Sequence, residues 1–216
     1  MLVMAVCLGV FLWAGDEINT QLQEYQAARS EYAELREQVG IHRPTAPSTE
    51  SADTGGTDEA AEDIDFDVLH ALHPGTIGWI VVPDTGISYP VVQGPDNNRY
   101  LHHTFLGVRN NSGAIFLDYR NAPDFTDALT IVYGHNMLDG SMFAPLHGWG
   151  GDRFMIHTPD GTMVFEVFDR QVVQANDELF QLHDTSSDDG ARIVMLSTCV
   201  TGQQSMRYVI LGRHIP

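Results

Sequence analysis

A chain of 216 residues can bury a substantial hydrophobic core, and its length favours one catalytic domain with an appendage. The formal net charge of −18 leaves no basic face for a phosphate backbone, so we expect no nucleic acid among its partners. All 11 basic residues are arginine, which excludes P-loop ATPases and lysine Schiff-base enzymes, because both need a lysine.

The N-terminal residues divide into an apolar segment and a predicted helix. Residues 1–15 are almost wholly apolar, but they fall short of the roughly 20 residues that usually span a membrane. No cationic residue precedes this segment and no small-residue cleavage site follows it cleanly, so we interpret it as a partial membrane anchor. A short, uncleaved signal-like helix is the alternative. Residues 16–42 are expected to form an N-terminal helix whose apolar stripe consists of Leu22, Tyr25, Tyr32, Leu35 and Val39.

A change of composition separates this helix from the folded domain. Residues 43–63 contain mainly Pro, Ser, Thr, Gly, Ala and acidic residues without an apolar period, which predicts a disordered acidic linker. The domain itself is expected over residues 64–216. It begins with a short predicted helix over Asp65–His73, which Pro74 and Gly75 end.

Eight short apolar runs follow, separated by Gly, Pro, Asn and Asp. They cover residues 78–82, 87–92, 114–117, 129–133, 154–157, 163–173, 192–196 and 207–211. This pattern predicts a mainly β domain, either a barrel or a sandwich. Short helical interruptions are expected at 97–102, 142–147 and 177–182.

Three chemically active side chains follow or flank strand-like runs. Cys199 comes after an apolar run, His135 after another, and Arg207 stands at the start of the last. A thiolate can attack an acyl carbon, an imidazole can move the protons, and a fixed cation can hold a developing oxyanion. The pattern therefore favours cysteine acyl transfer. The alternative for Cys199 is a buried, inert thiol, and a disulfide with Cys7 is not expected because Cys7 lies in the apolar segment.

Motifs spread over the domain resemble those of the sortases, and specifically class B sortases. In chain order they are Gly78-Trp79-Ile80-x-x-Pro83, Ile87-x-Tyr89-Pro90-Val91-Val92-Gln93, Asp96-Asn97-x-x-Tyr100-Leu101, Gly113-x-Ile115-Phe116-Leu117-Asp118, Tyr133-Gly134-His135-Asn136-Met137, Asp139-Gly140-Ser141-Met142-Phe143-x-x-Leu146, Leu196-Ser197-Thr198-Cys199 and Arg207-Tyr208-Val209-x-x-Gly212-Arg213. The chain departs from the family at Met195, where Thr is common, and in the seven residues that separate Cys199 from Arg207.

The resemblance implies a closed β-barrel of about eight strands and a cysteine transpeptidase. In that reading Cys199 is the nucleophile, His135 the general acid and base, and Arg207 the cation that holds substrate and oxyanion. Arg213 is the rival cation, but Arg207 is expected to open its strand, as the motif requires. The substrate-binding residues would be Asn97, Leu101, Ser197 and Thr198, and Asn136 would position His135.

The same resemblance implies the partners and the location. The enzyme would cleave a sorting signal of a surface protein after Thr, form a thioester, and pass the protein to an amine of a peptidoglycan precursor or a pilin. It would be held at the cell membrane with its catalytic domain outside the cytoplasm. No cofactor is expected, and no metal, because His102 and His103 lack a third ligand at a suitable spacing. Three aspartates, Asp84, Asp118 and Asp139, are interpreted as turn formers.

Two other functions fit parts of the sequence. A cell-wall cysteine hydrolase of the papain-like type also uses Cys and His, but it places Cys first, whereas here His135 precedes Cys199. The His-Gly-Cys-x-Arg signature of an L,D-transpeptidase is absent. A non-catalytic extracellular β-barrel binding module would need none of the three side chains, and thiol reactivity at Cys199 would distinguish it from an enzyme.

Overall fold

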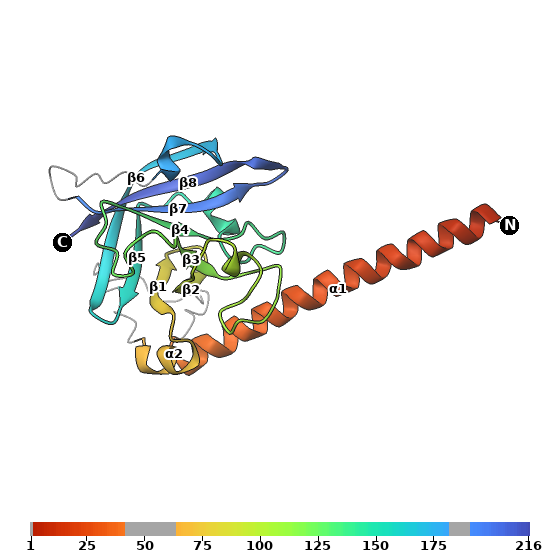
Figure 1. Ribbon diagram of the computed structural model, residues 1–216, viewed down its shortest axis with the longest axis horizontal. Coiled ribbons are helices and arrows are strands. Elements are labelled where there is room, and N and C mark those ends of the chain that lie inside the picture. The colour runs from red at the N-terminus through yellow and green to blue at the C-terminus, as the bar shows by residue number, and fades with distance from the viewer. Residues whose placement is uncertain (1, 42–63, 182–190) are drawn as a thin grey trace, which may run out of the picture.

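Eight strands close into a barrel in the computed structural model, which describes residues 2–41, 64–181 and 191–216 (Figure 1). The strands are β1 (Thr76–Val82), β2 (Ile87–Gln93), β3 (Ile115–Leu117), β4 (Leu129–Tyr133), β5 (Arg153–Thr158), β6 (Gly161–Gln174), β7 (Ile193–Val200) and β8 (Gln203–Ile215). Their order around the barrel is β1-β2-β3-β4-β7-β8-β6-β5. The predicted mainly β fold and closed barrel are confirmed, and each strand contains most or all of one predicted run.

The short helices lie at or close to the predicted positions, one before the first strand and three at the predicted interruptions. They are α2 (Phe66–Leu72), η1 (Arg99–Leu101), η2 (Ala144–Gly148) and η3 (Glu178–Phe180). The side chain of Asp65 caps α2 by accepting a hydrogen bond from the backbone N–H of Val68. The predicted linker at residues 43–63 lies outside the described residues.

One continuous helix, α1 (Leu2–Gln38), replaces the predicted apolar segment and separate helix. No proline interrupts it, and Gly15 does not take the left-handed conformation that commonly ends a helix. Its first half extends away from the barrel in Figure 1 and carries exposed apolar side chains such as Phe11 and Trp13. Among the described residues, no helix has a stretch both long and apolar enough to cross a membrane.

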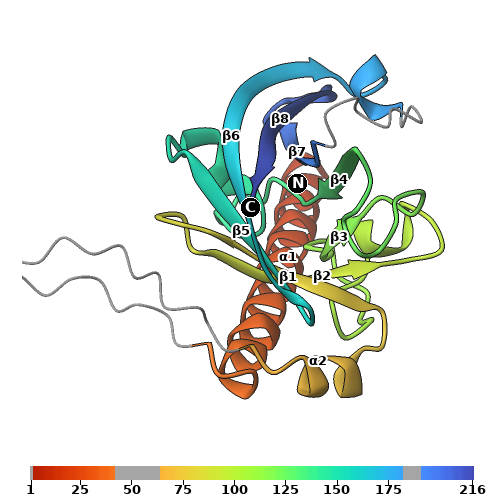
Figure 2. The same cartoon turned by 90° about the vertical axis from the view of Figure 1, so that its left-hand side faces the viewer.

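The second half of α1 packs against the barrel, close to β1 and β2 (Figure 2). Of the predicted stripe, Tyr32, Leu35 and Val39 are buried, whereas Leu22 is exposed because it lies before the contact begins. The hydroxyl of Tyr32 donates to the carbonyl of Gly113 at 2.9 Å, which satisfies a polar group inside this interface.

The β7–β8 hairpin determines where the reactive side chains lie. Its turn consists of Thr201 and Gly202, and Gly202 has a φ of 74°, which a glycine adopts without strain. Because the turn is so short, β7 continues through Cys199 to Val200, and Arg207 is the fifth residue of β8 rather than its first. Val200 pairs with Gln203 next to the turn, and a register shift between Cys199 and Val200 then places Arg207 directly opposite Cys199 in the ladder.

Candidate active site

Strand alternation brings Cys199 and Arg207 to one face of the barrel wall. Successive side chains of a strand point to opposite faces, so Cys199 shares a face with Met195, and Arg207 shares one with Leu211. Met195 and Leu211 belong to a small apolar cluster that is separate from the main core, and they pair across the hairpin. The thiol and the guanidinium consequently lie beyond the end of this cluster and not in the barrel interior.

A pocket of about 240 Å³ lies at this face. It is lined by Asn97, Leu101, Phe116, Tyr133, Gly134, His135, Ala175, Phe180, Ser197, Thr198, Cys199 and Arg207. All three predicted catalytic residues and all four predicted substrate-binding residues are in this set. Segments that are up to 110 positions apart in the sequence therefore meet around one partly exposed cysteine.

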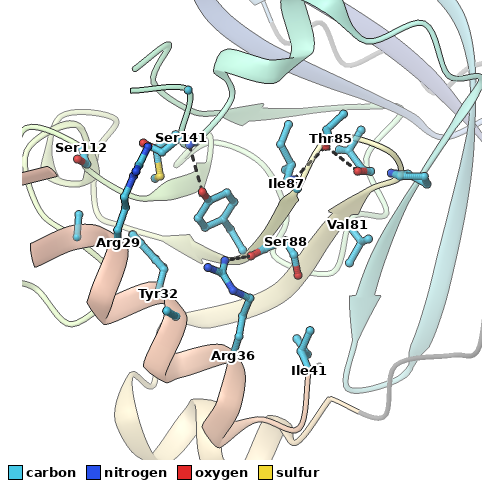
Figure 3. Close-up of a pocket in the computed structure, with 18 of the residues that line it drawn as sticks. Arg29, Tyr32, Arg36, Ile41, Val81, Thr85, Ile87, Ser88, Ser112 and Ser141 are labelled. Carbon is cyan, nitrogen blue, oxygen red and sulfur yellow. Dashed lines mark hydrogen bonds between the residues drawn. The ribbon is translucent and has the colours of Figure 1, made fainter. Parts of the chain in front are cut away.

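A larger hollow of about 500 Å³ lies elsewhere, between α1 and the β1–β2 hairpin (Figure 3). Arg29, Tyr32 and Arg36 face it from the helix, and Ser88 and Val81 from the strands. None of the predicted site residues lines it. We therefore assign the active site to the smaller pocket on chemical grounds, although the hollow is larger.

His135 follows β4, and its ring has a defined proton arrangement. Its Nε2 lies 2.8 Å from the carbonyl oxygen of Leu101. A carbonyl can only accept, so Nε2 carries a proton and donates it, which leaves Nδ1 as the basic nitrogen of a neutral ring. Burial lowers the pKa of His135, the Leu101 carbonyl partly offsets this, and His102 and Arg207 lower it further. The imidazole is thus a neutral proton acceptor at neutral pH.

The Arg207 side chain is held by the backbone of its own hairpin. Its Nη1 donates to the carbonyls of Gln204 at 2.7 Å and Met206 at 3.0 Å. No acidic side chain pairs with it among the described residues, so its charge is available to a ligand in the pocket. This is the arrangement that a developing oxyanion would need.

Asn136 contacts β7, the strand that carries Cys199. Its Nδ2 donates to the carbonyl of Cys199 and to the hydroxyl of Thr201, both at 2.9 Å. The predicted role for Asn136 was to position His135, but the hydrogen bonds of its amide hold the backbone of Cys199 instead. The ring of His147, a residue with no predicted role, lies with Nε2 3.0 Å from the same carbonyl oxygen and 3.1 Å from Nδ2 of Asn136, and it stacks on Tyr208.

Ser197 and Thr198 are almost fully buried below the pocket. Within the described part of the chain, neither hydroxyl has a hydrogen-bond partner. Buried polar groups are normally satisfied, so these two hydroxyls are candidates for binding a substrate. Asn97 and Leu101 also line the pocket, from the segment that leads into and through η1.

Asp118 also needs a correction, because it is more than a turn former. It accepts the backbone N–H of Arg120, as a turn aspartate does, but its carboxylate is completely buried and also binds two residues of the pocket wall. Local sequence gave no sign of these contacts, since the partners lie 21 and 15 residues away.

Comparisons with known proteins identify the family of this chain. The sortase domain family matches residues 80–215. Sortase B of Listeria monocytogenes is 34% identical over 183 residues, which cover 85% of this chain and 68% of that protein. The structure of sortase B from Bacillus anthracis in complex with AAEK1 aligns with a TM-score of 0.69 at 26% identity, over 90% of this chain and 99% of that one.

A further solved structure is a class B sortase of Streptococcus pyogenes involved in pilus biogenesis. It aligns with a TM-score of 0.63 at 27% identity and covers 70% of this chain and 98% of that one. The family domain spans more than half of the chain, and the Listeria relative exceeds 30% identity over most of both proteins. The chain therefore belongs to the sortase family, as a transpeptidase of class B.

Proposed function

We propose that this protein cleaves a C-terminal sorting signal after Thr through a thioester on Cys199, and transfers the cleaved protein to an amine. The observation that carries the proposal is the meeting of Cys199, His135 and Arg207 on one pocket. Family membership supports the reaction class, and the pocket supplies a nucleophile, a base and a cation for it.

The first half of the reaction forms the thioester. The Sγ atom of Cys199 attacks the carbonyl carbon of the substrate Thr while its proton passes to Nδ1 of His135. The carbonyl oxygen becomes an oxyanion, which the guanidinium of Arg207 stabilises. The C–N bond then breaks, and the imidazolium returns the proton to the leaving amine.

The second half reverses these roles. An amine of a peptidoglycan precursor or a pilin loses a proton to His135 and attacks the thioester carbon. A new C–N bond forms, the C–S bond breaks, and the imidazolium returns the proton to the sulfur of Cys199. The Asn136 and His147 side chains, by binding the Cys199 carbonyl, hold the nucleophile still through both steps.

The groove residues would bind the signal peptide before the chemistry. Ser197 and Thr198 offer two buried hydroxyls without partners among the described residues, Asn97 offers a side-chain amide, and Leu101 adds apolar surface. The pocket volume of about 240 Å³ suits a few side chains of an extended peptide. The client would be a surface protein that carries a sorting signal.

The apolar start of α1 supports a location at the membrane. We interpret residues 1–15 as part of an anchor, with the barrel on the extracytoplasmic side. There the transpeptidase would meet both its protein substrate and a cell-wall amine.

Activity should decline on the acid side, because protonation of His135 removes the acceptor for the thiol proton. The ordinary pKa of a histidine is about 6.5, and that of His135 is lower, so kcat/KM should begin to fall only below this pH. A pH profile of peptide cleavage measures the midpoint of this decline.

His102→Gln should move the midpoint to higher pH, because His102 lowers the pKa of His135. His103→Gln is the control. The His103 ring is hydrogen-bonded to the Arg99 carbonyl, and its removal should leave the midpoint unchanged. A midpoint well above 6.5 in the unaltered enzyme would contradict the assignment.

The direct test is a pentapeptide library with Thr at the fourth position, incubated with several candidate amines and analysed by mass spectrometry. The proposal predicts cleavage after Thr and a product in which the amine has replaced the leaving peptide. A cell-wall cysteine hydrolase would give only the free acid at every amine concentration. No cleavage after Thr in any library member would refute the proposal.

A further inference from the structure

An ion pair with a buried carboxylate contacts residues of the pocket wall. Asp118 follows β3 and is fully buried, and Arg120 contacts both of its oxygens, with Nε 2.8 Å from Oδ1 and Nη2 2.8 Å from Oδ2. A paired guanidinium and carboxylate with this geometry form a rigid unit. Neither residue lines the pocket.

Two pocket residues donate hydrogen bonds to the same carboxylate. Asn97 donates from Nδ2 to Oδ2 of Asp118 at 2.8 Å, and the hydroxyl of Tyr133 donates to that oxygen at 3.0 Å. The other end of the Asn97 amide is also fixed, because its Oδ1 accepts the backbone N–H of Tyr119 at 3.0 Å. The orientation of this amide is therefore set by contacts that lie outside the pocket.

Arg120 connects the same ion pair to η3, which also lines the pocket. Its Nη2 donates to the carbonyl of Phe180 at 3.0 Å, and Phe180 lines the pocket from η3. The Phe180 ring is stacked on Tyr133, with centroids 6.4 Å apart. We call Asp118, Arg120, Asn97 and Tyr133 the Asp118 network. It connects three segments that line the pocket: the segment before η1, the end of β4, and η3.

The charges in this network stay in place at every pH at which the enzyme would work. Burial alone would raise the pKa of Asp118, but the hydrogen bonds from Arg120, Asn97 and Tyr133 hold it below its ordinary value. Tyr133 keeps its proton, because burial and the neighbouring carboxylate raise its pKa. The carboxylate thus always accepts, and Tyr133 and Asn97 always donate to it.

We propose that Asp118 is a positioning residue that determines how the peptide substrate is recognised, by fixing which polar atoms Asn97 and Tyr133 present to it. With one N–H committed to Asp118, Asn97 keeps a second N–H that no hydrogen bond in the described part of the chain uses. The hydroxyl proton of Tyr133 is donated to Asp118, so its oxygen can only accept a hydrogen bond from a ligand. The free N–H of Asn97 is thus a donor and the Tyr133 oxygen an acceptor. Together they complement the C=O and N–H of a peptide group. This inference rests on the proposed function.

The test compares Asp118→Asn with Asp124→Asn, a matched control in an exposed turn. Among the described residues, the Asp124 carboxylate accepts hydrogen bonds only from Thr126. Peptide cleavage gives KM and kcat, and the rate of Cys199 labelling by a methanethiosulfonate reports the thiol independently. Because the network contacts peptide-binding groups and not the sulfur, Asp118→Asn should raise KM about tenfold or more, with kcat and the labelling rate changed less than about twofold. The control should match the unaltered enzyme.

Two results would overturn the inference. The first is a KM for Asp118→Asn equal to that of the control. The second is a labelling rate that falls together with the rise in KM, which would mean that the carboxylate acts on the cysteine or on the fold. If Asp118→Asn does not fold by circular dichroism, Tyr133→Phe decides, since it removes one hydroxyl: a KM raised about 5-fold supports the proposal, and an unchanged KM refutes it.

Failure of the proposed function has a different signature. In that case the unaltered enzyme shows no Cys199-dependent cleavage of any library peptide, and no peptide slows the labelling of Cys199; the inference then falls with the function. If the unaltered enzyme cleaves and Asp118→Asn behaves like the control, only the inference fails.

Discussion

Cys199→Ala should abolish both cleavage and transfer of a sorting peptide. The side chain supplies the only bond by which the acyl group can remain on the protein after the first peptide departs, and alanine cannot form it. Residual turnover should be indistinguishable from a reaction without enzyme, measured by mass spectrometry of products over several hours. The fold should be retained, because Cys199 is partly exposed and lies outside both apolar clusters.

The chain contains its own control for this experiment. Cys7 is the other cysteine of the sequence, and it is exposed on the projecting half of α1. Cys7→Ala should leave kcat/KM unchanged and should remove only the slower component of thiol labelling. Retained turnover in Cys199→Ala, or lost turnover in Cys7→Ala, would refute the assignment of the nucleophile.

Arg207→Ala should lower kcat/KM by about 10² to 10³, the usual cost of removing one oxyanion donor. Arg207 is opposite Cys199 in the β7–β8 ladder, and its guanidinium is the cation that lines the pocket. Because the charge it stabilises develops during the reaction, most of the loss should appear in kcat. Cys199 should still be labelled, since Arg207 is not needed to expose the sulfur.

Arg213→Ala is the matched control, because it removes the same charge from the same strand. Arg213 is exposed, lies over the Phe168 ring at 5.4 Å, and pairs across the ladder with Ile193 at the other end of β7. Its removal should change kcat/KM by less than about twofold, as is usual for an exposed side chain. The reverse pattern, a large loss for Arg213→Ala and none for Arg207→Ala, would exchange their roles.

The sequence predicts a mainly β domain because its strands differ from its loops in composition, and the family resemblance adds that the strands close into a barrel. Apolar runs bounded by Gly, Pro, Asn and Asp need no long-range information to be identified as strands. The β7–β8 hairpin shows the limit of this approach. The run at residues 192–196 ends early in the sequence because Ser197 and Thr198 are polar, yet the ladder continues, since backbone pairing to β8 does not depend on side-chain polarity.

Chemistry and motif together predict that Cys199, His135 and Arg207 lie close to one another, and the fold brings all three to one pocket. Their catalytic roles stay a prediction. The contacts of Asp118 could not be predicted in this way. Asp118 begins a turn, and a turn aspartate and a buried network aspartate look the same in one sequence. What distinguishes them is a set of donors from distant segments, and only the fold places those donors together.

Family membership decides between the alternatives that the sequence left open. A non-catalytic binding module and a papain-like hydrolase are both inconsistent with a chain that belongs to the class B sortases. Which peptide and which amine it uses are matters for the library experiment.

The acyl-enzyme itself provides the most direct test. The enzyme is mixed with a cleavable peptide in the absence of amine, quenched in acid, and analysed by intact-protein and peptide mass spectrometry. We expect a mass increase equal to the acyl fragment that ends in Thr, located on the peptide that contains Cys199 and removed by hydroxylamine. Peptide cleavage without any covalent adduct, or with the adduct on another residue, would contradict the account.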